Sequence, residues 1–318
     1  MPGPSLCRHG LCRIKPSFPG PVGKKSDMES GMHCSIRTVL VIHKANHEQA
    51  RSMAWTVAEW LAARDIVVLV RENVPEAQNA VVPAGAMVTA PPQLALILGG
   101  DGTMLSAARQ SVADGVPFFG INLGRVGFMT SAGLDDWQEV LDAILRDGFE
   151  VARRIMVDVS VIRGGQTVYC TTSLNDAVIS RGAMARLAAF DVTLGDADVC
   201  TLRADGVVIS TPTGSTAYCV SAGGPLIYPG LDVLCVVPIC PFLSDFKPVV
   251  VPAESPVRLA LSAPETNMYL TCDGQELFPL DDHDVVVVQK SPRCLKLATR
   301  PGDSYFGRLR LKGFINRP

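Results

Sequence analysis

Four short runs of almost uninterrupted apolar residues constrain the first half of this chain more than any other feature. They are Thr38–His43, residues 66–70, Leu94–Leu98 and residues 116–120. Strands that are apolar on both faces are typical of a parallel sheet covered by helices on each side. Apolar residues recur at helical spacing over residues 53–61 and 137–145. We therefore predict a Rossmann-like α/β domain with a mostly parallel sheet over residues 38–148.

The pattern changes after Phe149, where short segments alternate between apolar and polar residues. Examples are residues 157–161, residues 190–194, Val257–Leu261 and residues 284–288, separated by Gly, Pro and Asp. Such segments favour antiparallel strands with one buried face. We predict an α/β plus β protein, with a mostly antiparallel, β-sandwich-like domain over residues 149–300. Residues 1–37 are interpreted as a disordered leader or a misassigned start, and residues 301–318 as a tail packing back on the first domain.

Composition excludes several classes of function. The chain of 318 residues is 47% apolar, which suits two packed cores, and 29 Lys and Arg against 31 Asp and Glu give a net charge of −2. A nucleic-acid partner would require a basic surface, so we expect none. The ten cysteines form no Cys-x-x-Cys pair, and no 18 consecutive residues are apolar. We expect reduced thiols, no membrane segment and a cytoplasmic location.

The sharpest local motif is Gly-Gly-Asp-Gly-Thr at residues 99–103, directly after the run Leu94–Leu98 and before a helical stretch. Ligands bind at the carboxyl ends of strands in open α/β sheets, and glycines let backbone N–H groups approach phosphate closely. Asp101 among those glycines would repel phosphate unless it binds a metal or accepts a proton. The plain alternative is a tight turn in which Asp101 caps the following helix.

A second glycine-rich segment follows the next apolar run. Residues 120–128 read Gly-Ile-Asn-Leu-Gly-Arg-Val-Gly-Phe, with Asn122 near the start. Its glycines miss the dinucleotide-binding spacing G-x-G-x-x-G by one residue, so alone the segment specifies little.

Three clusters of polar residues interrupt the predicted β domain. They occupy residues 173–177, 203–206 and 210–224. Buried Asn, Asp and Arg need partners, and carboxylates can accept paired ribose hydroxyls while amides can bind an adenine or carboxamide edge. Each cluster alone is also compatible with a surface hairpin turn.

Taken in order, these motifs resemble those of bacterial NAD kinases, the ATP-NAD and polyphosphate/ATP-NAD kinase family. The resemblance rests on residues 99–103, 120–128, 175–176, 203–218, 238–241 and 273–275, and it covers nearly everything from Thr38 onward. The first motif is shared with diacylglycerol and sphingosine kinases, so it indicates a phosphotransferase superfamily. The block 203–218 is more specific to NAD.

The resemblance implies an activity: Mg²⁺-dependent transfer of the ATP γ-phosphoryl group to the 2′-hydroxyl of the adenosine ribose of NAD, giving NADP. Asp101 would accept the proton of that hydroxyl. Implied substrate-binding residues are Gly102, Asn175, Asp176, Arg186, Arg203, Asp205, Thr216, Ala217, Tyr218, Cys219, Val220, Ser221 and Gln275. Gly99, Gly100, Thr103 and Asn122 would form the phosphate loop. The metal would arrive with ATP, so no protein ligand is assigned to it.

The resemblance also implies a homodimer or homotetramer, and it leaves open whether ATP, GTP or polyphosphate is the donor. Phe242 and Leu243 stand where relatives usually carry polar residues, which puts a local contact or subunit interface in doubt. Two alternatives remain: a non-catalytic NAD(P)-binding sensor and a lipid kinase of the same superfamily. Asp101 within its intact motif disfavours the sensor, and Asn175-Asp176 with the 203–218 block disfavours the lipid kinase.

Overall fold

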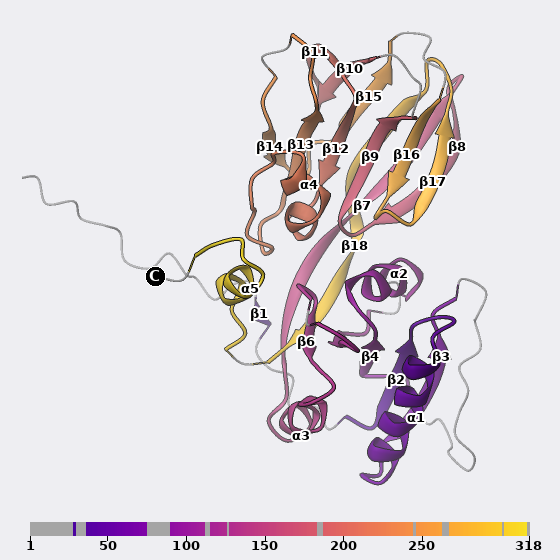
Figure 1. Cartoon of the computed structure of the whole chain (residues 1–318). Helices are drawn as coiled ribbons and strands as arrows, with labels where there is room; N and C mark the ends of the chain where they lie inside the picture. The colour runs from indigo at the N-terminus through magenta and orange to yellow at the C-terminus, as the bar shows by residue number, and fades with distance from the viewer. Residues whose placement is uncertain are drawn as a thin grey trace, which may run out of the picture.

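The computed structural model describes residues 28–29, 36–74, 90–111, 115–125, 127–182, 187–243, 246–262, 267–300 and 302–316. An α/β region and a β region lie at opposite ends of two long strands, β7 (Glu150–Arg163) and β18 (Val285–Thr299) (Figure 1). These strands pair antiparallel from Val285↔Ile162 to Thr299↔Glu150. Because both strands run through both regions, the regions share a common backbone framework.

The N-terminal α/β region is built on parallel strands in the order β3-β2-β4-β5. They are β2 (Thr38–His43), β3 (Val67–Glu72), β4 (Leu94–Leu98) and β5 (Phe118–Ile121), with the short β6 (Thr130–Ala132) beside β5. Every residue of β2, β4 and β5 is buried, as their uninterrupted apolar sequences predict. The predicted parallel sheet is confirmed.

Three helices cover this sheet. Helices α1 (Glu48–Ala62) and α3 (Trp137–Asp147) share one buried cluster with the sheet, and α2 (Asp101–Ser111) belongs to the cluster on the other face. Trp60 and Trp137 meet edge to face, with ring centroids 5.5 Å apart. The four buried side chains of α3 would each contribute about 1.5–3 kcal/mol of hydrophobic stabilisation. The buried residues of α2 pack on the sheet in the same way, and this packing fixes the position of α2 and of the loop before it.

The C-terminal region is antiparallel, which confirms the predicted β domain. One sheet contains β7, β8 (Gln166–Ser173), β10 (Ala188–Leu194), β11 (Ala197–Ala204), β15 (Val257–Leu261) and β18. The other runs β14-β13-β12-β9-β16-β17. Its strands are β9 (Asp176–Arg181), β12 (Gly206–Ser210), β13 (Val233–Ile239), β14 (Val249–Pro252), β16 (Met268–Cys272) and β17 (Glu276–Leu280).

Alternating side chains of the two sheets meet in one core, exemplified by Val159 of β7, Ile179 of β9 and Phe190 of β10. Between β12 and β13 the chain forms a 3₁₀ turn, η2 (Thr213–Thr216), and the single turn α4 (Tyr218–Ser221). Strand β12 and the first four residues of β9 are buried on both faces, because Val178 and Val208 pack in a second cluster with Cys219. Polar residues therefore stand at the adjoining strand ends, Asp176 at the start of β9 and Ser210 at the end of β12.

Strand β1 and helix α5, the first and last described elements, lie against the α/β region. Strand β1 (Met28–Glu29) pairs with β7, and the other residues of the predicted leader up to 35 lie outside the described residues. Helix α5 (Tyr305–Leu311) follows β18; Arg308 donates to Phe128 O and Ser131 Oγ, and Phe314 meets Phe128 edge to face. Among the residues that the structure describes, no helix has the length and apolarity needed to cross a membrane.

Candidate active site

Asp101 lies at the carboxyl end of β4, as the first residue of α2. Its carboxylate accepts hydrogen bonds from Phe128 N at 2.8 Å and Met129 N at 3.1 Å, from the second glycine-rich segment. It therefore braces a neighbouring loop rather than capping its own helix. A carboxylate has about four lone pairs, so each oxygen keeps one for a further donor.

The segment 120–128 is shaped around Asp101. A Cβ on Gly127 would lie 2.1 Å from Asp101 Oδ1, so the absence of a side chain is what allows this approach. Asn122 holds the loop internally, accepting from Gly124 N at 2.8 Å and donating to Arg125 O at 2.6 Å. Asn122, predicted as part of a phosphate loop, thus has a bracing role here, close beside Gly100.

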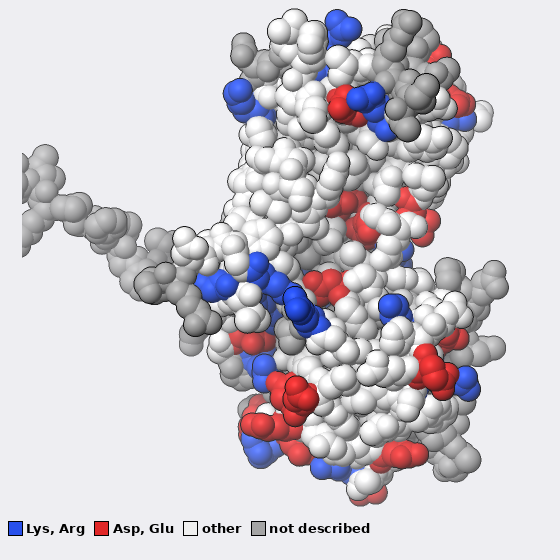
Figure 2. All heavy atoms as spheres, in the orientation of Figure 1, with Lys and Arg blue, Asp and Glu red and all other residues white. Residues whose placement is uncertain are grey.

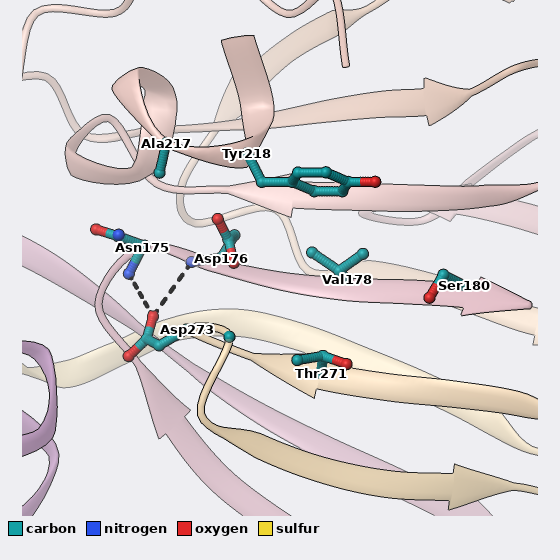
Figure 3. A pocket seen from close by; sticks show the side chains of 9 residues that line it. Asn175, Asp176, Val178, Ser180, Ala217, Tyr218, Thr271 and Asp273 are labelled. Carbon is teal, nitrogen blue, oxygen red and sulfur yellow. Dashed lines mark hydrogen bonds between the residues drawn. The ribbon is translucent and has the colours of Figure 1, made fainter. Parts of the chain in front are cut away.

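The Asn175–Asp176 turn lies between β8 and β9 and is held from both sides. On one side the Asp273 carboxylate accepts from Ser173 Oγ at 2.6 Å. It also accepts from Asn175 N at 2.7 Å and from Asp176 N at 3.4 Å (Figure 3). On the other side Thr211 N donates to Asn175 O at 2.8 Å. A Cβ on Gly214 would lie 2.2 Å from Asn175 O, so this glycine lets the 210–216 loop close on the turn.

A cavity of about 370 Å³ opens beside this turn. Figure 3 shows the Tyr218 ring lying along β9, with Asp176 pointing toward the space beside it and Thr271 across the strand. The lining residues are Asn175, Asp176, Val178, Ser180, Ala217, Tyr218, Thr271, Asp273 and Gly274. An aromatic ring beside carboxylate and amide groups is suited to a nucleoside, whose base stacks and whose hydroxyls donate.

Two polar groups of this cavity are buried. Asn175 Oδ1 is buried without a hydrogen bond. Asp176 is 4% exposed, and burial, followed by the charge of Asp273, raises the pKa of its carboxyl to about 7. Both are therefore placed to meet polar atoms of a ligand, which would remove part of the cost of burying them.

The turn between β16 and β17 joins the cavity to the Asp101 loop. Gln275 Nε2 donates to Gly102 O at 2.8 Å, and Arg109 of α2 donates to Gln275 Oε1 at 2.8 Å. Arg109 also reaches Asp273 at 3.2 Å. The predicted residues Gly102, Asn175, Asp176 and Gln275 thus lie in one continuous network with Asp101 beside it. Figure 2 shows acidic side chains gathered where the two regions meet, with basic side chains over nearby α5.

The other predicted residues are distributed around this network. Ala217 and Tyr218 line the cavity, and Thr216, Val220 and Ser221 lie in the same η2–α4 segment. Cys219 is buried beneath it, in hydrogen-bond contact with Cys235, which lowers the pKa of its thiol. Gly99 and Thr103 pack against each other behind the Asp101 loop.

Arg203 and Asp205 are not in the cavity. Asp205 forms an ion pair with Arg181 at 2.8 Å, at the far end of β9, roughly 17 Å along the strand from Asp176. Arg203 is exposed and its carbonyl accepts from Phe242 N. Arg186 lies outside the described residues.

Sequence reasoning missed three residues: Arg109, Asp273 as a separate contributor, and Arg308. Arg109 and Arg308 sit in helices without any motif, so only the tertiary structure brings them to the site. Asp273 belongs to the motif at residues 273–275, in which only Gln275 was assigned a role.

The described residues contain no group of three or more His, Cys, Asp or Glu side chains placed to hold an ion. Mg²⁺ in phosphoryl-transfer sites is commonly held by one or two carboxylates together with substrate phosphates. The carboxylates of this site, such as Asp101 and Asp176, therefore fit a metal ion that is bound mainly by the phosphates of a substrate.

Comparison with protein families gives two consecutive matches. Residues 39–149 match the ATP-NAD kinase N-terminal domain, and residues 174–299 match the ATP-NAD kinase C-terminal domain. The NAD kinase of Nitratidesulfovibrio vulgaris (strain Miyazaki F) is 41% identical over 284 residues, covering 89% of this chain and 99% of the relative. The NAD kinase of Oleidesulfovibrio alaskensis is 36% identical over 287 residues, covering 90% and 96%.

Two solved structures share the fold. Yeast NADH kinase, crystallised with NADH, superimposes with a TM-score of 0.75 at 21% identity, covering 89% of each chain. An NAD kinase from Archaeoglobus fulgidus, solved with ATP, gives a TM-score of 0.62 at 23% identity, covering 86% of this chain and 99% of that one. At these identities the likeness concerns the fold alone.

Proposed function

The chain belongs to the ATP-NAD kinase family, and from this premise we propose how its residues phosphorylate NAD. Membership confirms the resemblance drawn from the motifs, and it makes the chain an enzyme, a kinase acting on NAD. The lipid-kinase and sensor alternatives are not favoured. The single observation that carries the site assignment is the continuous network from Asp101 through Gly102 and Gln275 to the Asn175–Asp176 cavity.

NAD occupies the cavity beside β9 in this proposal. The Tyr218 ring offers a face for a base, and Asn175 and Asp176 offer an amide and a carboxylate for the adenine and ribose region. Support comes from the buried Asn175 Oδ1, which has no partner among the described residues, and from the buried carboxyl of Asp176, because a ligand that supplies hydrogen bonds gains most at such groups. Ala217 contributes cavity wall.

Asp101 accepts the proton of the ribose 2′-hydroxyl as that oxygen forms its bond to the γ-phosphorus. The bond from phosphorus to the bridging oxygen breaks, and ADP leaves with the electron pair. The two backbone N–H donors hold the carboxylate in one orientation, which is the main protein contribution that phosphoryl transfer requires. Mg²⁺ on the donor's phosphates would supply charge neutralisation.

Donor, assembly and location belong to the same proposal. We propose that ATP is the phosphoryl donor, with polyphosphate as the alternative. We also propose that the protein forms a homodimer or homotetramer and that it is located in the cytoplasm. Phe242 and Leu243 replace the polar residues usual in relatives, and both are exposed next to Arg203 and outside the cavity, so their apolar surface is available to a second copy of the chain. Light scattering at working concentration tests the assembly, and a monomeric mass would remove it from the proposal.

The test of the activity is NADP formation by purified protein from NAD and Mg²⁺ with ATP, GTP or polyphosphate as donor, and with NADH as the alternative acceptor. The expected product is NADP phosphorylated at the 2′-position, identified by its use by an NADP-specific dehydrogenase. A folded protein that binds NAD but forms no product with any of these donors would support the sensor instead.

A further inference from the structure

Asp273 is a buried carboxylate that the mechanism above does not use. Its side chain is 0% exposed, and besides Ser173 and Asn175 it accepts from Leu174 N at 3.1 Å and Asp176 N at 3.4 Å. Its own N–H donates to Asp176 O at 3.0 Å. One side chain therefore satisfies nearly all the backbone donors of the turn that presents Asn175 and Asp176 to the cavity.

The backbone at this point does not require a negative charge. Asp273 and Gly274 adopt φ of 53° and 63° in the tight turn between β16 and β17. Asn-Gly is as good as Asp-Gly for consecutive positive φ values. Asparagine would keep the turn but would offer one acceptor oxygen instead of two, so the carboxylate can be separated experimentally from the hairpin.

Arg109 connects this carboxylate to the helix that begins with Asp101. Its guanidinium, with a side chain 11% exposed, contacts Asp273 and Gln275 together, and Gln275 in turn bonds Gly102. The N-terminal turn of α2 and its last turns are thus both fastened to one hairpin. Because that hairpin also holds the Asn175–Asp176 turn, Arg109 is a direct bridge between the helix of Asp101 and the cavity.

We propose that Asp273 and Arg109 are positioning residues for phosphoryl transfer, which together hold the Asn175–Asp176 turn at a fixed place relative to Asp101. The proposal rests on the function proposed above. Asp273 shapes the NAD-binding turn, and Arg109 sets the placement of that turn against the Asp101 loop. Asp273 therefore governs the KM for NAD, and Arg109 governs kcat.

Asp273→Asn leaves the turn with fewer acceptors, so the KM for NAD rises on the order of tenfold or more. Arg109→Met leaves the turn bonded to Asp273 but loosens α2 against it, so kcat falls about 10- to 100-fold while the KM for NAD changes about threefold or less, since a displacement near 1 Å can cost that much. Arg109→Lys restores the contact with Asp273 but not the second contact with Gln275, so it recovers some of the lost kcat.

A matched control is available at the opposite end of the β region. Arg163 forms bonds of 2.9 and 2.8 Å with Asp284, whose side chain is also 0% exposed, far from the cavity. Arg163→Met removes a comparable ion pair. If Arg109 has only a structural role, both variants lower the thermal midpoint and neither alters kcat.

The pH profile of NAD affinity gives a second readout that structural loosening does not move. Three titratable groups face Asp176: Asp273 on the β16–β17 turn, Cys219 on α4 and Cys272 on β16. Arg109 and Glu276 lie behind them and interact with Cys272. Removing the charge of Asp273 moves the pH midpoint of the NAD KM profile down by about half a unit or more, because that charge raises the pKa of Asp176.

Steady-state kinetics with NAD varied measure kcat and the KM for NAD in wild type and the four variants. The measurements run from about pH 5.5 to about pH 9, so that they span the ionisation of Asp176. A kcat of Arg109→Met within twofold of wild type, or a pH midpoint of Asp273→Asn that equals that of wild type, overturns the positioning proposal. Wild type that forms no NADP instead overturns the proposed function, so the two failures are distinguishable.

Discussion

Replacing Asp176 with asparagine should make the protein more stable at pH 8. Burial and the charge of Asp273 raise the pKa of this carboxyl from 3.8 to about 7. At pH 8 the group is ionised in both states, so folding carries the cost of burying the ionised carboxylate. Asparagine carries no charge at any pH and has nearly the same shape. If the whole pKa shift is expressed, the variant gains about 4 kcal/mol at pH 8.

The gain depends on pH in a defined way. A raised folded-state pKa means that the stability linked to this group is fully present below the unfolded value and is lost as pH rises through about 7. The advantage of Asp176→Asn is therefore about 2 kcal/mol at pH 5, about 4 kcal/mol at pH 8, and close to zero near pH 3. Thermal midpoints at pH 5 and pH 8 measure it, with several degrees of increase expected at pH 8.

The exposed Asp135, in the loop before α3, provides a control of the same chemistry. Asp135→Asn should shift the midpoint by little at either pH, because an exposed carboxylate loses little hydration on folding. If Asp176→Asn is no more stable than wild type at pH 8, or if its advantage is the same at both pH values, burial of an ionised Asp176 is not a cost to this fold and the electrostatic argument fails.

Two further outcomes follow from the same geometry. Gly127→Ala should lower kcat on the order of 100-fold, because the new methyl would occupy the position of the Asp101 carboxylate. Gly124→Ala, in the same loop, is the control. Its methyl would meet only Asn122 Oδ1 at 3.8 Å, so its kcat in steady-state assays should be near that of wild type. Equal losses in both would show that the loop, rather than Asp101, is the sensitive element. The KM for NAD should rise as pH falls below about 7, approaching tenfold per unit, because only the ionised Asp176 accepts paired hydroxyls; a pH-independent KM in wild type would contradict this, and Asp176→Asn should remove the pH dependence.

The α/β region was predictable because its signal is local. Runs such as Leu94–Leu98 are apolar on both faces, and the strand occupies those residues. Strand β3 begins one residue later than the apolar run at 66–70 and continues through Arg71 and Glu72, since partial burial at an edge tolerates charge. The change to alternating segments after Phe149 likewise predicted the antiparallel sheets.

The site was predictable only to a limited extent, because its organisation depends on contacts between distant segments. The motif at residues 99–103 points to Asp101, but nothing in it shows that Phe128 and Met129 hold the carboxylate. The link from Arg109 to Asp273 spans 164 residues and leaves no pattern in the sequence. Arg203 and Asp205 carry the family motif yet lie at the far end of β9, which the linear sequence does not reveal.

The most direct test of the account compares NADP formation by wild type with that of Asp101→Asn and Asp101→Ala, alongside NAD binding by calorimetry. Asparagine keeps an acceptor for one of the two N–H donors of the glycine-rich segment but cannot accept a proton as a carboxylate does. We expect kcat to fall about 100-fold or more in both variants, and the affinity for NAD to stay within a few-fold of wild type. Turnover by Asp101→Asn close to the wild-type rate would contradict the role of Asp101 as the proton acceptor.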